Sequence, residues 1–88
     1  MPVVWIPPLL RRHTGGRNQL RVSGATVREV IASLEEQFPG MQGRLCTEEG
    51  RLRPEIAVAV DSDVAPEGLR ARVQEASEVH FVLALSGG

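Results

Sequence analysis

The fold is decided by the stretch Thr26-Val27-Arg28-Glu29-Val30-Ile31-Ala32-Ser33-Leu34-Glu35, which carries a clear helical pattern. Thr26 and Glu29 have the spacing of a capping box, in which each side chain accepts a hydrogen bond from the backbone amide of the other. Pro39-Gly40 ends the pattern. Five apolar residues recur at helical spacing and predict one buried face: Val27, Val30, Ile31, Leu34 and Phe38.

Short apolar runs on both sides of this helix predict a sheet. Before the helix, Val3–Ile6 and Gln19–Val22 are expected to pair as a hairpin. We expect the segment between them, Pro7–Gly16, to form a turn or longer loop in which Leu9 and Leu10 fold back over one end of the core. After the helix, residues 56–60 and 79–85 predict two more strands, and the last is apolar enough for the centre of a sheet.

The order of these elements favours a two-layer α+β domain. A β-grasp (ubiquitin-like) fold satisfies it, with a mixed sheet packed on one helix and the first and last strands parallel at the centre. A ferredoxin-like sandwich ranks second, because residues 61–78 lack the periodicity of a second long helix. We therefore expect one domain over residues 1–88, with a flexible C-terminal Gly-Gly tail at residues 86–88.

The composition excludes several classes of protein. The chain has 88 residues, a net charge of −1 and no lysine, since all ten basic residues are arginine. A P-loop nucleotide hydrolase and a Schiff-base enzyme both need a lysine. A nucleic-acid-binding protein would show a basic stripe. The chain has neither an apolar run of about 20 residues for a membrane span nor the pattern of a signal peptide, so we expect a cytoplasmic protein that binds no nucleic acid and no membrane.

The residues able to bind metals are scattered, and we expect no metal site. His13 and His80 are far apart in sequence, and the pair Asp61 and Asp63 has the composition of a turn. The single cysteine, Cys46, cannot form an intrachain disulfide. It is interpreted as a loop or packing residue, because no lysine or histidine next to it indicates a reactive thiol.

The C-terminal residues indicate a reactive group. The last strand leads into Leu83-Ala84-Leu85-Ser86-Gly87-Gly88. Residues without a Cβ atom can pass through a narrow channel and adopt backbone angles closed to other residues. The carboxylate of Gly88 would then be a chemical handle presented to the active site of another protein.

With this tail on a ββαβ…β plan, the whole chain resembles the ubiquitin-like sulfur carriers of the MoaD/ThiS type. The segment from Ile6 to Gly16 is similar to the first strand and loop of the branch that serves thiocarboxylate-dependent cysteine biosynthesis in actinobacteria. The segment from Thr26 to Glu35 matches the helix pattern of the family. The chain departs from the family before the last strand, where Glu75-Ala76-Ser77-Glu78 replaces a frequent Gly-Asp turn.

The resemblance implies a carrier rather than an enzyme. An E1-like partner would use ATP to adenylate Gly88, with Gly87 beside it, and a sulfur donor would convert the acyl group to a thiocarboxylate. No cofactor would be bound by this chain. The acceptor would be a PLP-dependent enzyme resembling cysteine synthase, with a zinc metalloprotease freeing the product. The large subunit of molybdopterin synthase, thiazole synthesis and tRNA thiolation remain alternative destinations for the sulfur.

Two other classes of function stay open: a ubiquitin-like protein modifier and a β-grasp interaction module without covalent chemistry. Without a lysine, the chain cannot form lysine-linked chains of itself. Alone, we expect it to be a monomer.

Alternation along the strands also predicts a partner-binding face. Residues on the side away from the helix would be mostly apolar, and an uncovered apolar face indicates a binding surface. The alternative is that residues 7–17 or the C-terminal half of the chain cover this face. The predicted partner-binding residues on this face are Trp5, His80, Val82 and Ala84, flanked by Ala57 and Ala59. Leu85 and Ser86, which lead into the glycines, complete the predicted partner-binding set.

Overall fold

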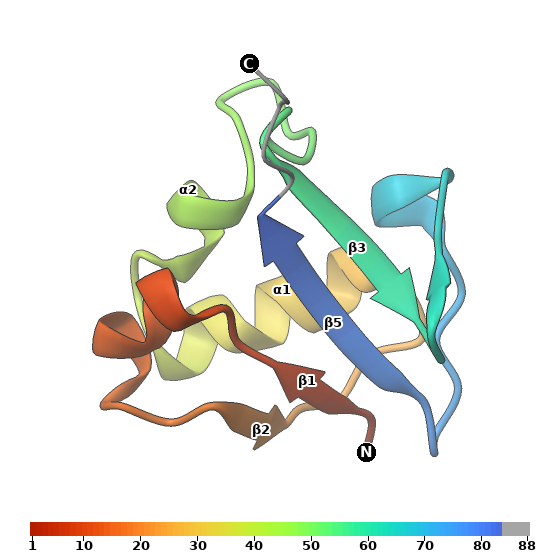
Figure 1. The fold of residues 1–88 in the computed structure, drawn as a ribbon, viewed down its shortest axis with the longest axis horizontal. Coiled ribbons are helices and arrows are strands. Elements are labelled where there is room, and N and C mark those ends of the chain that lie inside the picture. The colour runs from red at the N-terminus through yellow and green to blue at the C-terminus, as the bar shows by residue number, and fades with distance from the viewer. Residues whose placement is uncertain (84–88) are drawn as a thin grey trace.

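A computed structural model describes residues 1–83 of the chain (Figure 1). Five strands, two α-helices and two 3-10 helices follow one another along it. In chain order these are β1 (Val3–Trp5), η1 (Pro8–Thr14), β2 (Gln19–Arg21), α1 (Val27–Gln37), α2 (Met41–Leu45), β3 (Ile56–Val60), β4 (Asp63–Val64), η2 (Gly68–Arg70) and β5 (Glu78–Leu83).

The strands form one mixed sheet in the order β2-β1-β5-β3-β4. β1 and β5 are parallel and adjacent, and the other neighbours are antiparallel. α1 crosses one face of this sheet, behind it in Figure 1. The β-grasp arrangement expected from the order of elements is confirmed, including the parallel pair of first and last strands at the centre.

The core lies between the sheet and α1. Alternate residues of the central strands point inward, and Val4, Val58, Val79 and Phe81 are buried there. The predicted apolar face of α1 packs onto them through Val27, Val30, Ile31 and Leu34, while Phe38 follows the last helical residue and is half-buried.

The start of α1 differs in one detail from the predicted capping box. The Thr26 hydroxyl accepts a hydrogen bond from the Glu29 amide at 3.2 Å, as expected. The Glu29 carboxylate, however, accepts from the amide of Ala25 at 2.9 Å, one residue further back than Thr26. Ala25 is itself held by its carbonyl, which accepts from the Val73 amide at 3.0 Å.

The segment after β1 only partly matches the predicted turn or longer loop, because the turn lies at Gly15-Gly16 but most of the segment is helical. Pro8–Thr14 forms η1, which Gly15 ends in the left-handed conformation (φ 65°) that favours glycine. Leu10 packs against the core as expected, whereas Leu9 is 69% exposed. Leu9 therefore does not cover the core.

Asp61 and Ser62 form the predicted turn, which is a tight one. Both have positive φ (52° and 76°), as a two-residue type I′ hairpin turn requires. The turn joins β3 to β4, an edge strand of two residues that the sequence pattern did not predict. Residues 1–83 include no helix long and apolar enough to cross a membrane.

Candidate functional site

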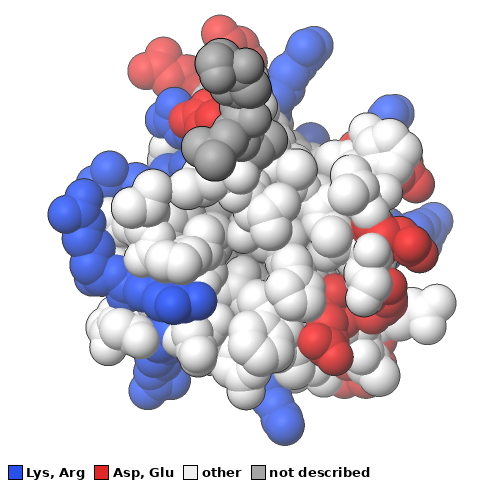
Figure 2. All heavy atoms as spheres, in the orientation of Figure 1, with Lys and Arg blue, Asp and Glu red and all other residues white. Residues whose placement is uncertain are grey.

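The face of the sheet opposite α1 carries the side chains that alternation predicted. The strand register places Trp5 beside His80, His80 beside Ala59, and Val82 beside Ala57. We call the surface formed by these five residues the outer face. Figure 2 looks onto it, and the centre of the view carries no charged side chain, in contrast to the margins.

Trp5 is held in one orientation on the outer face. Its ring stacks on the His80 imidazole with ring centroids 5.4 Å apart and planes 5° from parallel. The indole Nε1–H donates a hydrogen bond to the Glu78 carboxylate at 3.0 Å. A large side chain that is already oriented loses little conformational freedom on binding, which suits an anchor residue.

A shallow hollow of about 270 Å³ adjoins Trp5 on the outer face. Pro7, Pro8 and Arg11 border it on one side, and His80 and Val82 on the other. Val82 is 45% exposed. The segment that follows β1 thus borders the outer face, and it leaves Val82 open to solvent.

The structure adds one exposed residue that sequence reasoning missed. Val64 in β4 pairs with Ala59 and is 68% exposed, so it extends the apolar row of Trp5, His80 and Ala59 to the sheet edge. A strand of two residues is too short for an alternating pattern, so the sequence did not predict it.

The tail lies beyond the part of the chain that the structure describes. Ala84, Leu85, Ser86, Gly87 and Gly88 are outside residues 1–83, so their predicted roles stay predictions. The last described residue, Leu83, pairs with Ile56 of β3. The central strand of the sheet is therefore the element that leads to the glycines.

Cys46 packs in the core. It is 6% exposed, and burial raises the pKa of its thiol, an effect that the positive charges of Arg28 and Arg53 only partly oppose. A buried thiol with a raised pKa is a poor nucleophile. The interpretation as a packing residue is confirmed, and in residues 1–83 no three His, Cys, Asp or Glu side chains gather into a group that could hold a metal ion.

Comparisons with known proteins agree with this geometry. A family model described as "ThiS family" matches residues 4–88. The protein named "Sulfur carrier protein CysO" of Mycobacterium tuberculosis (strain ATCC 25618 / H37Rv) is 35% identical over 89 residues, which cover 97% of this chain and 96% of that one.

Two crystal structures share the fold over nearly the whole chain. A chain in the Amycolatopsis orientalis BexX/CysO complex superposes with a TM-score of 0.91 and 36% identity, covering 100% of both chains. Mycobacterium tuberculosis CysO superposes with a TM-score of 0.90 and 29% identity, covering 97% of this chain and 100% of that one.

Proposed function

Because the chain belongs to the ThiS family, whose model matches residues 4–88, we propose that it is a sulfur carrier protein that serves cysteine biosynthesis. The match includes Gly87 and Gly88 as well as the folded part, and this observation carries the proposal. The similarity to proteins named as sulfur carriers supports it. The protein would act in the cytoplasm as a co-substrate of other enzymes and would supply no catalytic side chain of its own.

The working group is the carboxylate of Gly88. A carboxylate does not accept a sulfur nucleophile directly, because oxide would have to leave. An E1-like partner joins this carboxylate to the α-phosphate of ATP, releasing pyrophosphate, and forms an acyl adenylate. A sulfur donor then attacks the acyl carbon and AMP leaves, so that the chain ends in a thiocarboxylate, which is a good sulfur nucleophile.

The acceptor of the sulfur is proposed to be a PLP-dependent enzyme that resembles cysteine synthase. The product would remain attached to Gly88 until a zinc metalloprotease released it. Both cofactors belong to the partners and not to this chain. The Amycolatopsis orientalis structure shows that a relative forms a complex with another protein.

Intact mass spectrometry tests the carrier function. The chain is incubated with ATP, sulfide and the adenylating enzyme of its host, and replacement of one oxygen by sulfur raises its mass by about 16 Da. Deletion of Gly88, or addition of one alanine after it, is expected to abolish the gain. The control inserts the same alanine between Glu48 and Glu49, which are exposed in the loop after α2. A wild-type chain that gains no mass with a competent partner would contradict the proposal.

We propose the outer face as the surface that docks on the adenylating enzyme, with Trp5 as its anchor. Trp5→Asp and Val82→Asp place a charge in an apolar contact and should each lower the rate of adenylation at least tenfold, through KM. Arg28→Asp, which is exposed on α1 at the other side of the sheet, is the control away from this face. Unchanged rates in both outer-face variants, with the fold intact, would remove the face from the docking surface.

A further inference from the structure

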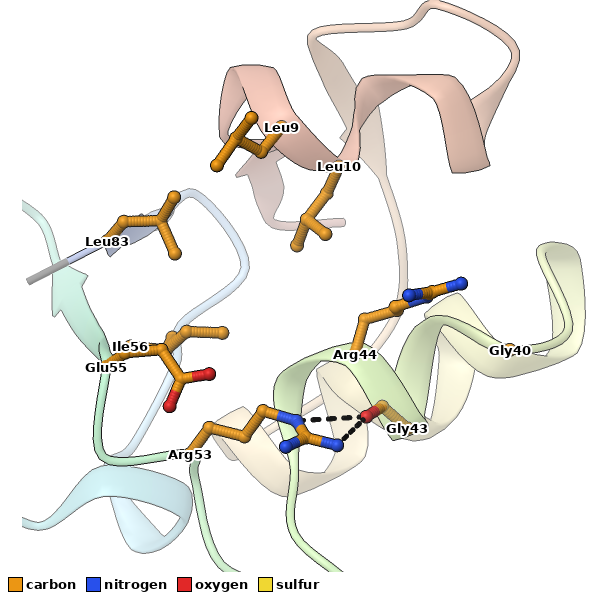
Figure 3. A pocket seen from close by; sticks show the side chains of 9 residues that line it. All are labelled: Leu9, Leu10, Gly40, Gly43, Arg44, Arg53, Glu55, Ile56 and Leu83. Carbon is orange, nitrogen blue, oxygen red and sulfur yellow. Dashed lines mark hydrogen bonds between the residues drawn. The ribbon is translucent and has the colours of Figure 1, made fainter.

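A second surface lies next to the outer face, between η1 and α2. It is a groove of about 590 Å³, within the range of ligand-binding pockets. In Figure 3, Leu9 and Leu10 of η1 lie above the groove, Leu83 lies at its left, and Arg44 of α2 lies below Leu10 with its guanidinium directed away from Leu83. We call it the η1–α2 groove. The remaining residues that line it are Gly40, Gly43, Arg53, Glu55 and Ile56.

The η1 wall of the groove is held rigidly. The Thr14 side chain is fully buried, with its hydroxyl within hydrogen-bond distance of the carbonyls of Arg11 (3.0 Å) and Arg17 (2.8 Å). The Arg11 Nε–H donates to the Ile6 carbonyl at 3.1 Å, which ties η1 to the end of β1. Leu9 is thus exposed on a well-anchored segment, so its exposure does not come from an unstructured loop.

The opposite wall carries two guanidinium groups and one carboxylate, from Arg44, Arg53 and Glu55. Arg53 is fixed by two hydrogen bonds from its guanidinium to the Gly43 carbonyl, at 3.1 and 2.7 Å. Arg44 forms no ion pair with any residue in 1–83. Desolvation and the nearby charges of Arg44 and Arg12 lower the pKa of His13, so Arg44 also lies close to the C-terminal end of η1.

The wider distribution of charge agrees with this. Figure 2 shows arginine side chains along the left margin, over η1 and α2, and carboxylates along the right margin and at the top, with further arginines at the right. Since the net charge of the chain is only −1, the positive charge at this groove reflects the separation of charges and not an overall excess.

We propose that the η1–α2 groove binds an acidic segment of a partner protein, which inserts an aliphatic side chain between Leu9 and Leu83 and pairs a carboxylate with Arg44. The aliphatic walls need an apolar group and the guanidinium groups need an anion, so an acidic peptide with a leucine-like residue satisfies both. A nucleic acid fits less well, because the groove offers no aromatic side chain for bases to stack on.

The groove shares Leu83 with the hollow beside Trp5. A partner that receives the tail could therefore contact the outer face and the groove together. The inference depends on the proposed function only for the identity of that partner. The chemistry of the groove does not depend on it.

NMR titration of the ¹⁵N-labelled chain tests the proposal without ATP, sulfide or any enzyme. The probe is the capped peptide Glu-Glu-Leu-Glu-Glu, with matched peptides that replace leucine by serine or glutamate by lysine. We expect shifts confined to the amides of residues 9, 10, 40–44 and 83, at least threefold weaker binding for the serine peptide and none for the lysine peptide. Shifts elsewhere, or none at millimolar peptide, would overturn the proposal.

Three variants complete this test. Arg44→Glu should abolish the shifts, whereas Arg70→Glu, which makes the same change in net charge on η2, should leave them unchanged. Leu9→Ser should weaken binding at least threefold and is not expected to unfold an exposed position. If inorganic phosphate or oligo-dT moves the same signals as strongly as the leucine peptide, the groove is a general anion site and the proposal is wrong. A chain that fails here and still gains mass with ATP and sulfide would retain the carrier function.

Discussion

Gly24 lies where the segment after β2 passes the first turns of α1. A Cβ atom added there would lie 2.7 Å from the Val30 backbone nitrogen and 2.9 Å from its Cγ2 atom. Both distances are too short for non-bonded atoms, and a backbone atom inside a helix cannot move aside easily. The absence of a side chain at this position allows β2 and α1 to approach.

Gly24→Ala should therefore lower the free energy of unfolding by about 1–3 kcal/mol, the usual cost of overpacking. Gly43→Ala is the matched control, because nothing lies within 4 Å of a Cβ atom placed there. That change in α2 should leave stability unchanged or raise it by up to about 1 kcal/mol. Urea unfolding measures both, and equal stability of the two variants would contradict the close approach.

At the scale of elements, the turn between β3 and β4 is linked to the start of β5. The Asp61 carboxylate accepts hydrogen bonds from the Glu78 amide at 2.9 Å and the Ser77 hydroxyl at 2.8 Å. These two bonds, the first above all, lower the pKa of Asp61. One side chain thereby holds an edge hairpin against the central strand.

This link predicts a dependence of stability on pH. A carboxyl group whose pKa is lowered by folding stabilises the native state above its unfolded pKa, and the contribution is lost as pH falls through the folded pKa. For Asp61 that loss lies below about pH 4, the ordinary range of aspartate. Asp61→Asn should be less stable than wild type at pH 7, and its stability should fall less between pH 5 and pH 2.

Urea unfolding at a series of pH values measures this effect. Asparagine tolerates the positive φ of position 61, so the turn itself is preserved. The control is Asp63→Asn, since the exposed Asp63 carboxylate accepts no hydrogen bond from residues 1–83. If the free energy of unfolding falls equally between pH 5 and pH 2 in Asp61→Asn and in wild type, Asp61 does not have this role.

The elements that the sequence predicted are those in which apolar residues recur at a regular spacing. α1 shows the helical spacing of apolar residues, and β3 and β5 show alternation, so their faces and the outward positions of Trp5, His80 and Val82 could be derived. η1 could not be derived, because it is stabilised by single contacts, such as the Thr14 hydroxyl with two carbonyls, that leave no periodic pattern. The η1–α2 groove was missed for a related reason: its walls come from segments distant in sequence.

At the scale of the whole molecule, β5 joins the two halves of the fold. It lies between β1 and β3, so strands from the beginning and the middle of the chain meet only through it. The buried residues of the described chain all lie at or before Phe81. The folded core and the glycine tail should therefore be separable by truncation.

A chain that ends at Leu83 should unfold cooperatively, within about 0.5 kcal/mol of wild type, because it keeps every residue that is buried in the described part of the chain. It should also gain no mass with ATP and sulfide. A chain that ends at Ser77 lacks β5 and should show no cooperative transition. Thermal unfolding followed by far-ultraviolet circular dichroism measures this, and loss of folding in the chain that ends at Leu83 would contradict the prediction.

The stacked pair of Trp5 and His80 has a practical consequence. Because the chain contains one tryptophan and no tyrosine, nearly all of its near-ultraviolet absorption and its intrinsic fluorescence come from this single indole. The outer face thus carries its own optical probe. Docking of a partner would change the emission without any label.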